Sequence, residues 1–140
     1  MVAARDATFA APFVLRGLVP DGGAAWFLAR ALGRQRAAAL LLTGDRLTAP
    51  EAAGAGLVSR ICEPGAALET ATDLASQLAR GPAEALRLTK GMIRAALDLT
   101  LERFLEVEWL SATLDITGPD AAEGRAAFVE KRDPDFSKTR

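Results

Sequence analysis

Asp21 is the residue whose position in the sequence points most directly to proton chemistry. It lies in GLVPDGGAAWF, residues 17–27, between a proline and two glycines and directly before an apolar run. Its carboxylate could cap the following helix by accepting the free amides near Ala24. It could instead transfer protons at a pocket. The residue types alone leave both roles open.

Several other chemistries are excluded within the chain. It contains no histidine and one cysteine, Cys62. A Ser-His-Asp triad, a Cys-His pair and a histidine-ligated zinc site are therefore impossible, as is an internal disulfide. We expect no metal site, and we expect Cys62 to be a small buried residue.

The composition is that of a globular protein with a core. Of the 140 residues 50% are hydrophobic and 25% are charged, with a net charge of -1, so a nucleic-acid partner is not expected. No apolar run approaches the roughly 20 residues of a membrane span, so no membrane partner is expected. Arg5, Asp6 and Arg16 interrupt any secretion signal near the N-terminus. These features predict a cytoplasmic protein.

Mostly helical elements are predicted to position Asp21. A short strand is expected within Ala7–Leu15, and a loop through Asp21 leads to a helix over Gly22–Leu32 that ends at Gly33. Leu57 to Ile61 is expected to form a turn or strand. Further helices are expected over Arg34–Leu42, after the capping box Thr48–Glu51, over Ala66–Arg80 and Ala83–Leu97, from about Thr100, and over Asp120–Lys131.

The strand candidates, one or two near the N-terminus, raise a problem of backbone hydrogen bonding. A lone strand cannot satisfy its N–H and C=O groups. The chain is therefore either an all-helical protein with an unusual apolar entry or the second half of an α/β domain. The start at Val2, which enters mid-pattern, favours the second interpretation.

Five blocks of the sequence resemble one known family. They are FAAPF…GLVPDGG (Phe9–Gly23), LTGDRLTAPEA (Leu42–Ala52), GLV (Gly56–Val58), LTK (Leu88–Lys90) and EGRAAFVEKR (Glu123–Arg132). In this order and spacing they resemble the enoyl-CoA hydratase/isomerase family, or crotonase superfamily, especially its branch of phenylacetyl-CoA ring-epoxide isomerases. The resemblance implies the C-terminal portion of an α/β crotonase-like fold. Residues 1–65 would complete the core, and residues 66–140 would form a helical trimerisation region.

The resemblance also implies a chemistry. Family members act on CoA thioesters through an enolate, whose oxygen is bound by two backbone amides from the first half of the fold. A hydratase carries a glutamate after the proline of the FxxP pattern, whereas this chain has Phe13. An isomerase of the branch named above carries an aspartate in the GLVPD loop, which corresponds to Asp21.

The remaining site residues also follow from the resemblance. Phe13, Gly22 and Trp26 are assigned to the acyl-binding site, although a tryptophan at such a position is more often part of a core. Phe128 and Lys131 match the family's FxxK pattern, in which the ring and the cation reach the adenine and phosphates of CoA. A core phenylalanine beside a helix-end lysine is the alternative interpretation of this pair.

The resulting hypothesis is an acyl-CoA isomerase that depends on a missing N-terminal half. Its substrate is an acyl-CoA, coenzyme A is part of that substrate, and no other cofactor is expected. A homo-oligomer, either a trimer or a dimer of trimers, is expected as well. The alternative is a non-catalytic assembly module derived from a crotonase. A half-domain would expose one face of its core, so self-association or poor solubility is predicted.

Overall fold

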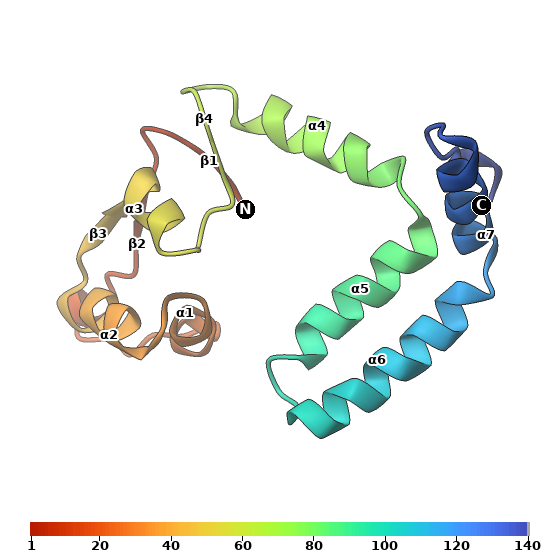
Figure 1. The fold of residues 1–140 in the computed structure, drawn as a ribbon. Helices are drawn as coiled ribbons and strands as arrows, with labels where there is room; N and C mark the ends of the chain where they lie inside the picture. The colour runs from red at the N-terminus through yellow and green to blue at the C-terminus, as the bar shows by residue number, and fades with distance from the viewer. Residues whose placement is uncertain (140) are drawn as a thin grey trace. The chain divides into compact units, whose positions relative to one another are not determined.

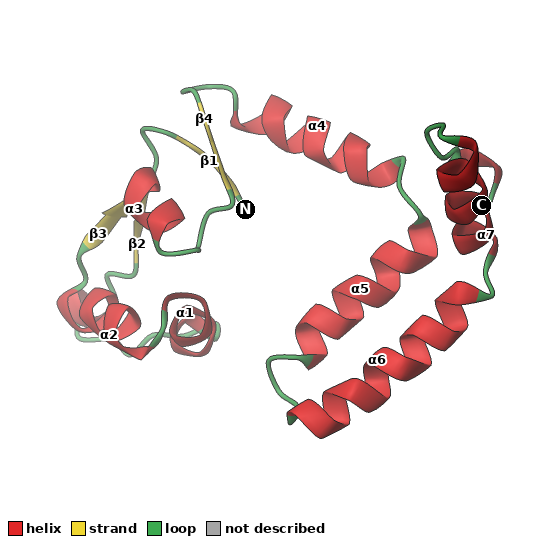
Figure 2. Ribbon diagram, viewed as in Figure 1, coloured by secondary structure: helices red, strands yellow, loops and turns green. Residues whose placement is uncertain are grey.

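The computed structural model describes residues 1–139. The chain divides into two compact units, Met1–Asp73 and Leu74–Arg140. Helices dominate both units, and the strands are short and confined to the first (Figures 1 and 2). The mostly helical chain with short N-terminal strands is therefore confirmed. No helix among the described residues is long and apolar enough to cross a membrane.

The first unit pairs its strands with segments far along the chain. Strand β1 (Val2–Ala4) runs parallel to β4 (Arg60–Cys62), and β2 (Thr8–Ala10) runs antiparallel to β3 (Arg46–Thr48). These pairings answer the question of the lone strand, because the N-terminal strands receive their hydrogen bonds from residues beyond position 45. The strand in Arg46–Thr48 was not predicted.

Glycine and threonine signals set the helix ends in the first unit. Helices α1 (Ala24–Leu32) and α2 (Arg34–Thr43) pack together and are separated by Gly33, as predicted. Helix α3 (Ala49–Gly54) begins with the predicted capping box, in which the Glu51 carboxylate accepts from the Thr48 amide at 2.8 Å. The Glu51 carboxylate also accepts from the Thr48 hydroxyl at 2.7 Å, and the two hydrogen bonds from Thr48 lower the pKa of Glu51.

The buried core of the first unit is small and rich in alanine. One cluster consists of Ala3, Ala49, Ala52 and Val58, and a second consists of Ala11, Leu32 and Leu40. Cys62 was expected to be buried but is only half-buried, since it lies on the two-stranded β1–β4 sheet, and its thiol donates to the Ala3 carbonyl at 3.5 Å.

The second unit consists of helices tied together at one buried aspartate. Helices α5 and α6 lie side by side and α7 contacts both (Figure 1). The Asp120 carboxylate accepts from the Glu84 amide at 3.2 Å and from the Thr139 hydroxyl, which joins the start of α5 to the last described residues. The helices are α4 (Ala67–Ala79, which crosses the unit boundary), α5 (Ala83–Ala95), α6 (Leu101–Ile116), α7 (Pro119–Glu130) and the 3₁₀ turn η2 (Phe136–Lys138).

Candidate functional site

A short 3₁₀ turn, η1 (Val14–Arg16), prepares the loop that carries Asp21. The Phe13 carbonyl accepts from the amides of Arg16 and Leu18 at 2.9 and 3.0 Å. One carbonyl oxygen before the turn therefore binds both the last residue of the turn and the loop that follows it. The Phe13 side chain is half-buried and packs against the cluster of Ala11, Leu32 and Leu40. Phe13 therefore anchors the loop to the core.

The Asp21 carboxylate does not serve as the helix cap. Gly23 occupies the N-cap position of α1 and has no side-chain hydrogen bond, while the Ala24 amide donates to the main-chain carbonyl of Asp21 at 2.9 Å. Gly22 and Gly23 have φ values of 57° and 79°, which lets the chain turn sharply into the helix. The Ala24 amide is thus satisfied by backbone, and the side chain of Asp21 is exposed.

A row of stacked groups runs from this turn along α1. The Phe27 ring lies against Gly23, where an added Cβ would come within 3.1 Å of it. Trp26 contacts Phe27 edge to face, with ring centroids 4.8 Å apart, and the Arg30 guanidinium lies 3.6 Å above the Trp26 ring. Trp26 is 47% exposed, so it is not the core residue that its type suggested.

The loop is also bordered by apolar side chains. Leu15 packs so closely on Gly44, at the end of α2, that an added Cβ there would lie 2.7 Å from the Leu15 Cγ. Leu18 and Val19 are exposed beside Pro20. Asp21 is thus a carboxylate at the end of an apolar loop, and Gly22 and Trp26 follow it in the same segment.

The proposed CoA-binding pair belongs to the second unit. Phe128 lies near the end of α7 and is 85% exposed, so it is not part of a core formed by the described residues. Lys131 is exposed, follows the last residue of α7 and has a left-handed backbone with φ 55°. An exposed ring and an exposed cation thus share one helix terminus.

Charged groups surround that terminus. The Arg132 guanidinium donates to both oxygens of Glu123, at 2.6 and 3.0 Å, and to Glu130 at 2.5 Å. The Asp135 amide adds a bond to Glu123 at 2.7 Å. Arg132, followed by the Asp135 amide, lowers the pKa of Glu123 to about 2. Glu123, Glu130 and Arg132 lie within the motif Glu123–Arg132, but the resemblance assigns no role to them, and Asp135 lies beyond the motif.

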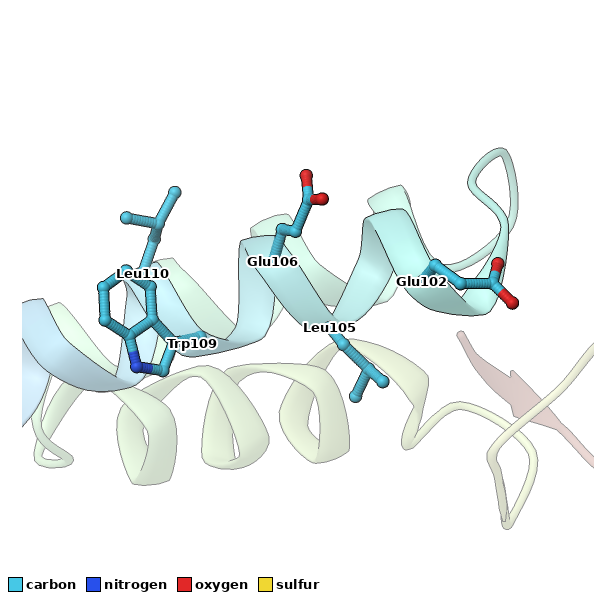
Figure 3. A pocket seen from close by; sticks show the side chains of 5 residues that line it. All are labelled: Glu102, Leu105, Glu106, Trp109 and Leu110. Atoms are coloured by element: carbon cyan, nitrogen blue, oxygen red, sulfur yellow. The ribbon is translucent and has the colours of Figure 1, made fainter.

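A shallow hollow on α6 is lined by five residues of that one helix. Figure 3 shows Leu105 and Trp109 among them, with two acidic side chains. Its lining is mostly apolar, and Arg103 pairs with Glu106 at 2.8 Å. The hollow contains none of the site residues expected from the sequence. Its lining is Glu102, Leu105, Glu106, Trp109 and Leu110.

Within residues 1–139, no group of three or more His, Cys, Asp or Glu side chains is arranged to hold a metal ion. The Asp21 loop offers a carboxylate. The chemistry available at the end of α7 is recognition of an anion and a planar ring.

The family model for enoyl-CoA hydratase/isomerase matches residues 1–139. The chain belongs to this family. Solved structures agree on the crotonase-like fold: an enoyl-CoA hydratase from a Polaromonas species superimposes with a TM-score of 0.91 at 38% identity, over 95% of this chain and 52% of that one.

The relatives of this chain within the family include both an isomerase and a hydratase. The 1,2-epoxyphenylacetyl-CoA isomerase of Escherichia coli is 37% identical over 98% of this chain and 52% of the relative. The 2,3-dehydroadipyl-CoA hydratase of the same species is 36% identical over 97% of this chain and 53% of the relative. The chain thus spans about half the length of the curated relatives it matches.

Proposed function

We propose that this chain is part of an acyl-CoA thioester isomerase in which Asp21 transfers the proton. The observation that carries the proposal is the exposed Asp21 carboxylate just before α1, which does not cap the helix; the Ala24 amide bonds the Asp21 main-chain carbonyl instead. Phe13 stands where the resemblance expects a hydratase glutamate, and a phenyl ring cannot exchange a proton.

The reaction that fits is a proton shuttle along the acyl chain. The Asp21 carboxylate takes a proton from one carbon, and the electron pair left behind forms an enolate on the thioester. The resulting carboxylic acid returns the proton to another carbon, so the double bond moves and no co-reactant is consumed. The acyl group would lie against Phe13, Gly22 and Trp26.

The enolate oxygen needs hydrogen-bond donors fixed in place before the reaction. Loss of a single such donor costs about 10²–10³ in rate. The resemblance assigns these donors to the half of the family fold that this chain does not span, so turnover requires that half. Coenzyme A enters as part of the substrate, with Phe128 and Lys131 at its nucleotide end, and no further cofactor is needed.

The test is an assay of the chain combined with a separately supplied first half of the family fold, taken from the Escherichia coli 1,2-epoxyphenylacetyl-CoA isomerase, with a panel of enoyl-CoA and ring-epoxide CoA thioesters. Asp21→Asn preserves the shape of the side chain but removes the base, and we expect it to lower turnover by about 10²–10⁴. Asp6→Asn is the matched control, an exposed aspartate in another turn of the same unit, and should leave turnover unchanged. Equal rates for Asp21→Asn and wild type would refute the catalytic role.

One observation favours a second candidate, a non-catalytic assembly module that forms a trimer or a dimer of trimers. Large apolar side chains are exposed along α5 and α6, among them Ile93, Leu101 and Trp109. Such faces are typical of surfaces that a partner covers. Inactivity of both wild type and Asp21→Asn, with a defined oligomer by light scattering, would support this candidate over the isomerase.

A further inference from the structure

Lys131 has an unusual backbone conformation. Among residues 1–139 it is the one non-glycine residue with positive φ, at φ 55° and ψ 40°. Helices commonly end with a residue in this left-handed conformation, but that residue is usually glycine, because a Cβ is unfavourable there. A side chain kept in such a conformation by its surroundings is a marker of a functional position.

The helix end around Lys131 is a complete Schellman motif. The Arg132 amide donates to the Ala127 carbonyl at 3.1 Å, and the Lys131 amide donates to the Phe128 carbonyl at 3.3 Å. These two bonds close the last turn of α7 and place Lys131 directly after the turn that carries the exposed Phe128 ring. The position of the ammonium therefore depends on what holds this turn in its left-handed form.

The side chains of Glu123 and Arg132 hold the turn at Lys131 in this conformation. The Arg132 fork binds both Glu123 oxygens, at 2.6 and 3.0 Å, which fixes the residue after Lys131 to the middle of α7. Glu123 also accepts from the Asp135 amide at 2.7 Å, so the chain beyond the turn is fixed to the same carboxylate. Arg132 further engages Glu130, the acid next to Lys131 in the sequence, at 2.5 Å.

We propose that Glu123 and Arg132 are positioning residues that hold Lys131 in its left-handed conformation and thereby present its ammonium to the phosphates of CoA. The proposal rests on the CoA-binding role given above to Phe128 and Lys131. Neither Glu123 nor Arg132 touches the ligand. The bidentate Arg132–Glu123 pair fixes the turn. The Arg132 guanidinium also binds the Glu130 carboxylate, so that carboxylate does not form an ion pair with the Lys131 ammonium.

The experiment measures binding of CoA to the full chain by calorimetry, at a temperature at which melting curves show every variant folded. Glu123→Gln keeps an acceptor for the Asp135 amide but loses the charged fork, and we expect it to weaken binding about tenfold. Lys131→Gly removes the cation, suits the left-handed backbone and should weaken binding at least as much. The control is Glu106→Gln, which breaks the Arg103–Glu106 pair on α6 and should leave binding unchanged.

A double variant separates positioning from general stabilisation. In the Lys131→Gly background, Glu123→Gln should cause no further loss of CoA affinity, because no ammonium remains to be positioned. A purely structural role for Glu123 would lower the melting temperature but leave CoA binding by the folded chain unchanged. That result, or additive losses in the double variant, would overturn the positioning role.

Failure of the underlying CoA site would look different. If wild type does not bind CoA, or if Lys131→Gly binds it as well as wild type, the CoA role of Lys131 is wrong and the positioning proposal fails with it. If Lys131→Gly weakens binding and Glu123→Gln does not, the CoA role stands and only the positioning role is overturned.

Discussion

At the scale of single residues, two aspartates near helix starts have opposite environments. Asp120 is 7% exposed, and its carboxylate accepts from the Glu84 amide and the Thr139 hydroxyl. The Asp120 carboxylate therefore has a structural role, because it links the start of α5 to the last described residues of the second unit. Asp21 is exposed, and its main-chain carbonyl, not its carboxylate, bonds the first turn of α1. Of the two, Asp21 has the carboxylate that is open to solvent.

Lys131 provides a prediction about stability at this scale. Lys131→Gly removes a left-handed penalty of about 1–2 kcal/mol, part of which is offset by the greater freedom of glycine in the unfolded chain. We therefore expect a net gain of up to about 1 kcal/mol in the free energy of unfolding, measured by urea denaturation. Lys131→Ala is the control. It removes the ammonium but keeps the Cβ, so it should bring no gain, and equal stabilisation by both changes would contradict this account.

At the scale of elements, the contact between α2 and η1 supports the Asp21 loop. Gly44 ends α2 with φ 71°, and a Cβ there would lie 2.7 Å from the Leu15 Cγ. We expect Gly44→Ala to destabilise the chain by about 1–3 kcal/mol in thermal or urea unfolding, from backbone strain together with displacement of Leu15.

Gly54→Ala is the matched control for that prediction. Gly54 ends α3 without a positive φ, and an added Cβ there meets no atom within 4 Å. Alanine at this position should be neutral or stabilising by up to about 1 kcal/mol. Equal losses at Gly44 and Gly54 would show that the packing of Leu15 on α2 does not matter.

The elements also show what the sequence could predict. The ends of α1, α3 and α6 followed from Gly33, Thr48 and Thr100, because caps and glycines act within one turn. The strand at Arg46–Thr48 was missed, since three residues carry too little alternation and the pairing comes from β2, far away in the sequence.

The position of Phe128 and Lys131 at a helix end was predictable from the sequence, but the backbone conformation there was not. The motif EGRAAFVEKR places Phe128 and Lys131 at a helix end, and the structure agrees with that location. The left-handed lysine was not predictable, because glycine is the usual sequence signal for that position. Nor was the bond between Arg132 and Glu123, which lie two and a half turns apart in sequence and meet only after the chain reverses direction at Lys131.

At the scale of the whole molecule, the chain exposes much of its large apolar surface. The buried residues of the first unit are mainly alanines, whereas large side chains in both units are exposed. A protein of this size normally buries such side chains. The chain spans about half the length of its curated relatives, and exposed apolar faces of this kind are typical of surfaces that a partner covers.

This exposure predicts self-association of the isolated chain. We expect its apparent mass in light scattering to rise with protein concentration, because apolar faces such as that of α6 are removed from water when copies meet. Trp109 is 66% exposed on that face and contacts the hollow of Figure 3, so Trp109→Gln should shift the equilibrium toward monomer. Trp109→Phe, which keeps an apolar ring on the same face, is the control and should not. A cooperative melt from a strictly monomeric wild-type chain at all concentrations would show that these exposed faces do not drive association.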